Sequence, residues 1–364
     1  MRTMRIKTVR LKNFRNYGEQ TVEFSNGLNV LSGKNASGKT NLLEAVYLAG
    51  VGRSPRTSKE KELIKYNEDC ASVKITVEKK YRSHSVELYF DKSGKKSVKI
   101  DGIPVQKMGE LLGVLNVVFF SPDELKFIKD TPDVRRRFMD ISLSQQKKDY
   151  FYALQRYTKA LKQRNNLLKQ NSPAALEDLL DVWDVQLANE GAKIVLERNR
   201  FIEELAAPAK AAHLAVSGVN ELLELSYETD VEGVSYEEIR VCLIKKLSAA
   251  REKDIRLQFT SVGPHRDDIA IFLNGADARR FSSQGQQRTA ALSVKLSELK
   301  LFLRETGETP VLLLDDVLSE LDETRQNLLI KEASFAQVIL TCTSFPVNSP
   351  RNLFIVENGT VLKM

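Results

Sequence analysis

Apolar and polar residues alternate along much of the first 105 residues, which is the pattern of strands that bury one face. The alternation begins at Ile6 and Leu11 and is most regular over residues 71–105. A short apolar run at 28–31 leads directly into a glycine-containing loop. The pattern predicts two opening strands, a buried strand at 28–31 and an antiparallel meander over 71–105.

A helical pattern replaces the alternation from about Thr131. No Gly or Pro interrupts the chain from Val134 to Gln170, residues 171–173 (Asn-Ser-Pro) break the pattern, and it resumes from Ala174 to Lys210. These two lengths predict a hairpin of long helices, which would form an arm. Residues 221–240 carry seven acidic residues and one Arg, and this charge predicts a solvated stretch.

The last third of the chain returns to short apolar segments. Alternation surrounds residues 259–272, a helical run covers 287–304, and compact apolar runs occupy 311–314, 338–340 and 353–356. An uninterrupted apolar run is typical of a strand buried on both faces of a parallel sheet. Together with the meander, these runs predict an α/β fold with a mixed sheet that has an antiparallel part.

The loop after the 28–31 strand matches G-x-x-x-x-G-K-[ST] at every fixed position and precedes a helical run. Its glycines let backbone N–H groups surround a polyphosphate, and the helix N-terminus adds partial positive charge. We expect Lys39 to reach the β- and γ-phosphates of ATP and the Thr40 hydroxyl to hold Mg²⁺. The residues predicted to bind the nucleotide are Gly33, Lys34, Asn35, Ala36, Ser37, Gly38, Lys39 and Thr40.

Two acidic residues, Asp315 and Asp316, follow the apolar run 311–314. Functional groups collect at the carboxyl ends of parallel strands, so Asp315 is expected to complete the Mg²⁺ shell and Asp316 to polarise an attacking water. Lys39 and Asp315 are 276 positions apart (315 − 39). If both meet at one phosphate, the chain between them is an insertion that splits a single ATPase domain.

A third polar motif, residues 281–288, opens the helical run that precedes Asp315. Ser283, Gly285 and Gln286 at a helix start would form a second anion site, since helix N-termini attract negative charge. One nucleotide needs only one cradle, so a second is useful if Ser283 covers the γ-phosphate held by another copy of the chain. An ordinary helix cap is the alternative interpretation.

Charge is concentrated in the predicted arm. The whole chain has a formal net charge of +7, whereas residues 126–169 hold 12 Lys and Arg against four Asp, a local net of +8 (12 − 4). Such a cluster with interleaved Tyr and Phe favours contact with DNA phosphates. The alternatives are a solvated helical face or, for Arg135–Arg137, buried ion pairs. The predicted DNA-binding residues are Arg135, Arg136, Arg137, Lys147, Lys148, Arg156, Lys159 and Lys162.

Composition excludes several other classes of protein. Three widely separated Cys argue against a disulfide scaffold, and with three His they give no zinc-site spacing. No apolar run of about 18 residues and no signal-peptide pattern is present, so a cytoplasmic protein is expected. His265 has no accompanying Ser or Cys nucleophile pattern, which favours a structural role for it.

These motifs resemble a known family. Residues 282–286 (Ser-Ser-Gln-Gly-Gln) are similar to the signature of ABC-type ATPases, and residues 319–322 to their D-loop. The further motifs Leu11–Tyr17, Phe120–Asp123, Asp133–Asp140 and Gly263–Asp267 resemble those of the RecF family, a DNA-acting branch related to the SMC and Rad50 proteins. The chain departs from the wider ABC-type pattern at Asp316, where a Glu is usual, and at 341–343 (Thr-Cys-Thr), where a switch His is usual.

The resemblance implies a weak DNA-linked ATPase of recombinational repair and replication. It implies an ABC-type head at 1–130 plus 258–364, with a helical arm inserted at 131–257. It also implies an ATP-dependent homodimer, binding to single-stranded or gapped DNA without sequence preference, a RecR-type mediator as partner, and a role in SOS induction. An SMC- or Rad50-type head and the nucleotide-binding subunit of an ABC transporter are the alternatives, and the short arm and the long insertion disfavour them.

Overall fold

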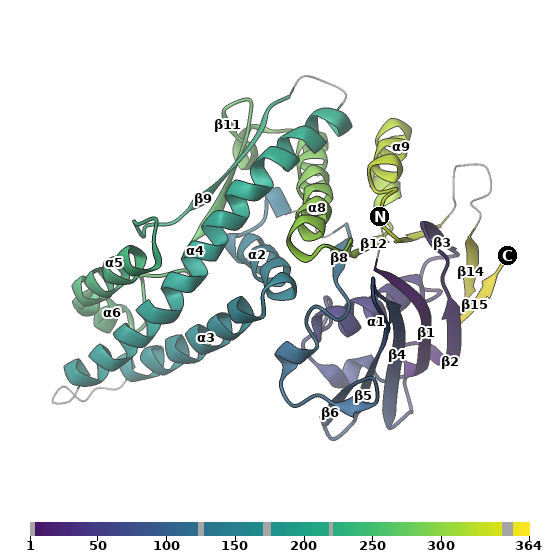
Figure 1. Ribbon diagram of the computed structural model, residues 1–364, viewed down its shortest axis with the longest axis horizontal. Helices are drawn as coiled ribbons and strands as arrows, with labels where there is room; N and C mark the ends of the chain where they lie inside the picture. The colour runs from purple at the N-terminus through teal and green to yellow at the C-terminus, as the bar shows by residue number, and fades with distance from the viewer. Residues whose placement is uncertain (1–3, 123–126, 170–175, 218–220, 344–351) are drawn as a thin grey trace. The chain divides into compact units, whose positions relative to one another are not determined.

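A computed structural model of the protein describes residues 4–122, 127–169, 176–217, 221–343 and 352–364 (Figure 1). The predicted break at 171–173 and the motif residue Asp123 lie outside these ranges. The chain divides into two compact units. The first comprises residues 1–126, 211–220 and 284–364, and the second comprises 127–210 and 221–283.

The unit boundaries differ from the expected domain boundaries mainly at residues 258–283. This segment was expected in the ATPase head, yet it belongs to the second unit. The reason is strand pairing: β10 (Asp268–Leu273) pairs antiparallel along its length with β9 (Leu223–Glu228) and at its end with β11 (Ala276–Asp277). The first unit remains discontinuous, with its main segments at the two ends of the chain.

The first unit contains a largely parallel six-stranded sheet with strand order β15-β14-β3-β13-β12-β8. Only the edge strand β15 runs antiparallel to its neighbour. The strands are β3 (Leu28–Ser32), β8 (Val117–Phe120), β12 (Val311–Asp315), β13 (Val338–Cys342), β14 (Leu353–Glu357) and β15 (Thr360–Lys363). The three predicted apolar runs of the last third are therefore strands, whereas β8 and β15 were not predicted from the sequence.

Alternate residues of the central strands face two different hydrophobic cores. Val311 and Leu313 pack in the core that includes α1 (Lys39–Val51), whereas Leu312 and Leu314 pack in the core that includes α8 (Gln284–Thr306) and α9 (Glu323–Glu332). Both faces of these strands are thus buried, as the uninterrupted apolar runs predict. Burial on both faces fixes which strand ends carry the polar side chains of the site.

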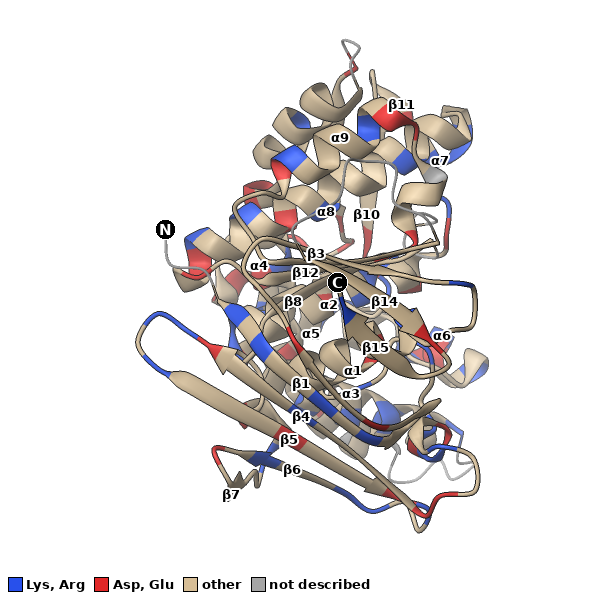
Figure 2. Ribbon diagram, turned by 90° about the vertical axis from the view of Figure 1, so that its right-hand side faces the viewer, with Lys and Arg blue, Asp and Glu red and all other residues tan. Residues whose placement is uncertain are grey.

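A second sheet of the first unit is antiparallel, with order β2-β1-β4-β5-β6-β7. Its strands are β1 (Arg5–Phe14), β2 (Tyr17–Glu23), β4 (Cys70–Glu78), β5 (Ser83–Asp91), β6 (Lys96–Ile100) and β7 (Ile103–Pro104). The predicted meander over 71–105 is confirmed. Figure 2 shows Lys and Arg interspersed with Asp and Glu on this sheet, and Lys74 pairs with Glu87 across two of its strands at 3.6 Å.

The second unit is mainly helical, and its helices correct three expectations. They are α2 (Pro132–Gln146), α3 (Lys148–Leu168), α4 (Leu176–Ser217), α5 (Tyr236–Ala249), α6 (Arg251–Leu257) and α7 (Ala278–Phe281), with the end of α4 reaching into the first unit. The single helix expected over 133–169 is two helices, because Lys147 adopts an extended conformation (φ −133°, ψ 104°). The helix expected to end at Lys210 continues to Ser217 and contains Pro208, and the buried Leu205, Ala209 and Ala212 offset the local cost of this proline.

Residues 221–240 are solvated, as expected, with six of their seven acidic residues exposed: Glu224, Glu228, Asp230, Glu232, Glu237 and Glu238. The same stretch also supplies β9 and the start of α5, which a Ser235–Glu238 capping box stabilises. The third correction is that alternation around 259–272 produces a strand only from Asp268, and His265 lies between α6 and β10. In the described parts of the chain, no helix combines the length and apolar character needed to cross a membrane.

Candidate functional site

The loop between β3 and α1 has the backbone conformation of a phosphate cradle. Ala36 (φ 64°) and Gly38 (φ 120°) occupy the left-handed half of conformational space. A Cβ added to Gly33 would lie 2.2 Å from the carbonyl oxygen of Val356, so only glycine fits there. The loop ends at the N-terminus of α1, whose first turn carries unpaired N–H groups and partial positive charge.

Lys39 lies across this loop. Its Nζ donates to the carbonyl oxygens of Gly33 at 2.7 Å and Lys34 at 2.8 Å, and the residue is 7% exposed. Among the described residues, no acidic side chain forms an ion pair with this ammonium, so it is available to pair with an anion. The Ser37 hydroxyl is also buried and has no hydrogen-bond partner among the described residues. Both side chains fit a bound polyphosphate.

The structure brings Thr40 and Asp315 together across the sheet, although 275 positions separate them. Thr40 Oγ1 donates to Asp315 Oδ1 at 2.9 Å, and Thr341 Oγ1 donates to the same oxygen at 2.8 Å. Strands β3, β13 and β12 are parallel neighbours, so their carboxyl ends place these groups at one edge. A hydroxyl and a carboxylate oxygen in contact are ligands of the kind that Mg²⁺ prefers.

Asp316 is held by its backbone next to this pair. It has a left-handed conformation (φ 51°), and its N–H donates to Thr341 Oγ1 at 2.9 Å. Thr341 therefore joins Asp315 and Asp316, whereas the neighbouring Thr343 contributes a carbonyl that accepts from Ser32 Oγ at 3.4 Å. Of the two threonines considered for the place of the switch His, Thr341 is the one in the site. Thr341, like Asp315, lies at the end of a buried apolar strand, and this position in the sequence could have identified it as a residue of the site.

The predicted signature residues lie at the start of α8. Ser283 is exposed immediately before the helix, and Gly285 and Gln286 are half-buried in its first turn. A Cβ added to Gly285 would meet open space, and its φ is not positive. Neither packing within the chain nor backbone strain therefore explains this glycine. Thr289 Oγ1 donates to the Gly285 carbonyl at 2.9 Å and fixes the first turn.

The structure corrects one predicted DNA-binding residue, Arg135. Its guanidinium is 1% exposed and forms a bidentate ion pair with Asp268, with Nε–Oδ1 and Nη2–Oδ2 distances of 2.6 and 2.8 Å. It also donates to the carbonyl of Asp130 at 2.6 Å. Arg136 is largely buried as well and donates to the Asp267 carbonyl at 2.5 Å. Arg135 therefore forms a buried ion pair within the second unit, which was the alternative interpretation, and it is not available to contact DNA.

The remaining predicted DNA contacts lie at the surface of the second unit. Arg137, Lys148, Arg156, Lys159 and Lys162 are exposed. Two of the predicted residues also form ion pairs with α4: Lys147 with Glu197 at 2.6 Å and Arg156 with Glu190 at 2.9 Å. These pairs join α4 to α3 and to the junction before it, and the two helices run alongside one another in Figure 1.

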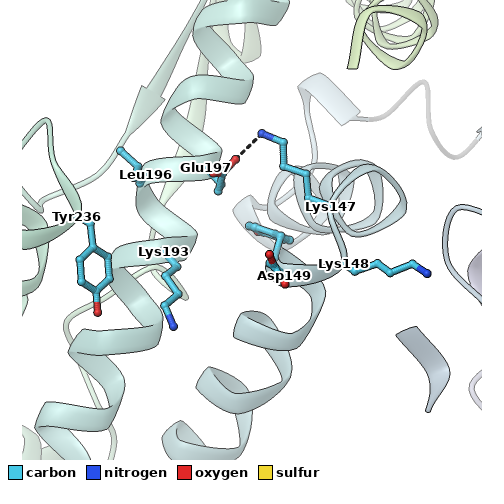
Figure 3. Close-up of a pocket in the computed structure, with 8 residues that line it drawn as sticks. Lys147, Lys148, Asp149, Lys193, Leu196, Glu197 and Tyr236 are labelled. Carbon is cyan, nitrogen blue, oxygen red and sulfur yellow. Dashed lines mark hydrogen bonds and ion pairs between the residues drawn. The ribbon is translucent and has the colours of Figure 1, made fainter. Parts of the chain in front are cut away.

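A cavity of about 400 Å³ opens beside the start of α3. It is lined by Lys147, Lys148, Asp149, Tyr150, Lys193, Leu196, Glu197 and Tyr236. Figure 3 shows Lys147 turned toward Glu197 and Lys148 pointing away from that pair. The lysines here are therefore not equivalent, since one is neutralised by its neighbour and Lys148 remains exposed to solvent.

His265 is a structural residue, as the sequence favours. Its Nε2 faces the Thr260 carbonyl at 2.9 Å, so this nitrogen carries the proton, and Tyr157 donates its hydroxyl to Nδ1 at 2.7 Å. Burial lowers the pKa of His265 to about 4, and burial raises the pKa of Asp267, two residues away, to about 6. The two groups thus have opposite linkage to folding.

Because the contributions of His265 and Asp267 to stability change in opposite directions with pH, they partly cancel in the wild type, and removing one should reveal the other. The His265 contribution is present above its unfolded pKa of about 6.5 and is lost as the pH falls toward 4. The Asp267 contribution is present below about 3.9 and is lost as the pH rises toward 6. Between pH 4 and 6.5, unfolding of an Asp267→Asn variant should take up more protons than unfolding of the wild type, by up to about one, because the variant lacks the proton that Asp267 releases on unfolding. Urea titrations across this pH range give the slope of the free energy of unfolding against pH, from which the proton uptake follows. Equal slopes for the variant and the wild type would contradict the prediction.

Comparisons with known proteins show the family and the fold of this chain. The family profile described as the RecF/RecN/SMC N-terminal domain matches residues 5–351. The DNA replication and repair protein RecF of Agathobacter rectalis is 45% identical over 93% of this chain and 92% of its own length. RecF of Clostridium tetani is 41% identical over 99% of this chain and 100% of its own.

Solved structures extend the similarity to the fold. The recombination mediator protein RecF of the RecFOR pathway, solved with ATP and with ATPrS, matches with TM-scores of 0.93 and 0.92 at 39% and 40% identity, over all of this chain and 98% of each matched chain. The Smc head domain of Pyrococcus furiosus, at 19% identity and a TM-score of 0.57 over 99% of this chain and 96% of its own, shows the fold alone. The expected ABC-type ATPase fold is confirmed, and the chain belongs to the RecF family of DNA replication and repair proteins.

Proposed function

We propose that this RecF-family ATPase binds ATP with Mg²⁺ at Gly33–Thr40 and hydrolyses it slowly. The contact of Thr40 Oγ1 with Asp315 Oδ1 at 2.9 Å carries the proposal, because it joins the two halves of a Mg²⁺–nucleotide site. Lys39 would bind the β- and γ-phosphates, and Asp316 would orient the attacking water. Bound Mg²⁺ would neutralise charge on the phosphates. Asp316 is shorter by one methylene than the usual Glu, which is consistent with weak turnover.

ATP is proposed to join two copies of the chain. The exposed Ser283 and the open surface at Gly285 suit a phosphate held by another copy. A Ser283→Arg variant should therefore bind ATP but stay monomeric in sedimentation with ATP and Mg²⁺, where the wild type dimerises. Ser93→Arg, at an exposed turn of the antiparallel sheet, is a control that should dimerise normally. Normal dimerisation of Ser283→Arg would exclude the sandwich arrangement.

DNA is proposed to bind the exposed face of α3. Lys148, Lys159 and Lys162 lie at helical positions i, i+11 and i+14, within about 60° around the helix axis. They span about 21 Å, the length of roughly six base pairs. Such a row contacts phosphates and reads no bases, so we expect single-stranded or gapped DNA to bind without sequence preference.

Reversing these three charges tests the DNA surface. Lys148→Glu/Lys159→Glu/Lys162→Glu should weaken DNA binding by at least about tenfold and lower the slope of log affinity against log salt by about two to three, because counterion release falls with the number of phosphate contacts. The matched control reverses Lys95, Lys99 and Lys107, which are exposed in the first unit. Fluorescence anisotropy at several salt concentrations measures both quantities. An unchanged slope in the α3 variant would rule out this face.

The proposed partners follow from the family. The matched structures describe RecF as a recombination mediator of the RecFOR pathway. We propose that this chain likewise works with a RecR-type mediator, supports recombinase loading and SOS induction, and acts in the cytoplasm. Pull-down of a RecR-type protein with and without ATP tests the partnership.

A further inference from the structure

The turn between β1 and β2 lies against the outer side of the phosphate loop. Asn16 Nδ2 donates to the carbonyl oxygen of Ser37 at 3.0 Å, and the Tyr17 hydroxyl donates to the carbonyl oxygen of Gly38 at 2.9 Å. Tyr17 is fully buried, and this burial raises its pKa, so its hydroxyl stays protonated as a donor. Neither residue belongs to the G-x-x-x-x-G-K-[ST] motif itself.

A second turn supports the same carbonyl group. The N–H of Gly359, in the β14–β15 turn, donates to the Ser37 oxygen at 3.0 Å. Gly359 is left-handed (φ 76°), and a Cβ there would lie 2.6 Å from the carbonyl oxygen of Asn16. The two turns therefore approach each other closely at Gly359, and two donors, Asn16 Nδ2 and the Gly359 N–H, fill the lone pairs of the Ser37 carbonyl oxygen.

The β1–β2 turn is itself anchored to α1. Arg15 forms a bidentate ion pair with the buried Glu44, with Nε–Oε2 and Nη2–Oε1 distances of 2.9 and 2.7 Å. Asn41 Nδ2 donates to Asn16 Oδ1 at 2.9 Å, which orients the Asn16 amide so that its nitrogen faces Ser37. Helix α1, which begins at the end of the phosphate loop, thus holds the turn whose side chains donate to that loop.

Peptide geometry gives these contacts a consequence for phosphate binding. In a trans peptide the C=O of one residue and the N–H of the next point in opposite directions. If the Ser37 and Gly38 carbonyls are held toward the β1–β2 turn, the N–H groups of Gly38 and Lys39 point away from it, toward the open side of the loop. Those N–H groups are among the donors that surround a polyphosphate.

We infer that Asn16 and Tyr17 are positioning residues for nucleotide binding, which hold two carbonyls of the phosphate loop outward and thereby aim the N–H groups of Gly38 and Lys39 at the triphosphate. The inference rests on the proposed ATP site. A loop preorganised in this way loses little conformational freedom when the anion binds, so its affinity depends on residues that never touch the ligand.

The test compares Asn16→Ala and Tyr17→Phe with the wild type in binding of fluorescent ATP and in competition by inorganic tripolyphosphate. Each variant should weaken both ligands by the same factor, about fivefold to tenfold, because the lost orientation affects only phosphate contacts. Urea titration should show that both variants keep a free energy of unfolding large enough to be fully folded under the assay conditions. Gln20→Ala is the matched control: Gln20 exchanges two hydrogen bonds with the Val361 backbone of the same β14–β15 hairpin, and among the described residues it forms no hydrogen bond with the phosphate loop.

Lys39→Ala separates this inference from the proposed function. If Lys39→Ala loses ATP while Asn16→Ala and Tyr17→Phe bind both ligands as the wild type does, the positioning role is wrong and the nucleotide site stands. If Lys39→Ala binds ATP normally, the site and the inference both fail. Loss of affinity in proportion to unfolded protein, or in Gln20→Ala to the same extent, would also overturn the inference.

Discussion

A Lys39→Ala variant is expected to bind ATP about 100-fold more weakly than the wild type and to lose measurable ATP hydrolysis. Lys39 is the buried cation of the phosphate loop, and its Nζ is held 2.7 and 2.8 Å from the carbonyls of Gly33 and Lys34. Removing one partner of a desolvated charge pair costs about 2–5 kcal/mol, and about 2.7 kcal/mol corresponds to the expected factor. The two carbonyls would then face the phosphates with no cation between them.

Lys34→Ala is the matched control for this prediction. Lys34 belongs to the same predicted nucleotide-binding loop, where an alanine keeps its backbone N–H, but its side chain is exposed. Lys34→Ala therefore removes a positive charge near the site and leaves the backbone of the loop unchanged. A general effect of positive charge near the loop would appear in both variants, whereas a specific phosphate contact would appear only in Lys39→Ala. Titration of fluorescent ATP and a phosphate-release assay measure binding and turnover. Equal affinity of Lys39→Ala and the wild type would remove the nucleotide site from Gly33–Thr40.

The parts of the candidate nucleotide site could be located from the sequence because each of them is local. Gly33–Thr40 needs only a strand before it and a helix after it, and Asp315 needs only an apolar run that ends in an acid. Parallel strands in one sheet then leave a single edge where the two can meet. The contact of Thr40 with Asp315 across 275 positions follows from these local patterns and one rule of topology.

The parts that the sequence does not predict depend on contacts between distant segments. Nothing in the composition around Lys147 distinguishes it from the helices on either side, yet it ends α2. In the sequence, Tyr17 is simply an apolar position of a β-strand. Only the structure shows that its hydroxyl lies against a carbonyl of the phosphate loop. Each of these features is decided by packing, which local propensity does not contain.

Charge counting fails for a related reason. A count of 12 basic residues in 126–169 treats Arg135 and Arg137 alike, although one is buried and the other exposed. Helical periodicity could have separated them, since Arg135 lies with the buried Phe138 and Met139 on one side of α2. A charged residue on an apolar helix face needs a buried counter-charge, and Asp268, 133 positions away, supplies it.

Arg135→Ala is accordingly expected to lower the free energy of unfolding by about 3 kcal/mol, with no direct effect on DNA. Truncating one partner of a buried ion pair costs about 3–5 kcal/mol, because the other charge stays desolvated. The lower end applies here, since Asp268 keeps Arg279 at 3.2 Å and the N–H of Ile269 at 2.8 Å.

The adjacent Arg137 provides the control, because it has the same charge but is exposed. Arg137→Ala should change the free energy of unfolding by less than about 0.5 kcal/mol. Its DNA affinity should fall if the surface beside α3 binds phosphates. In Arg135→Ala, DNA affinity per folded molecule should match the wild type at a temperature where the variant is folded. Urea titration and fluorescence anisotropy on the same samples separate the effects on stability and on DNA binding. If Arg135→Ala were as stable as the wild type but bound DNA more weakly, Arg135 would be a DNA contact after all.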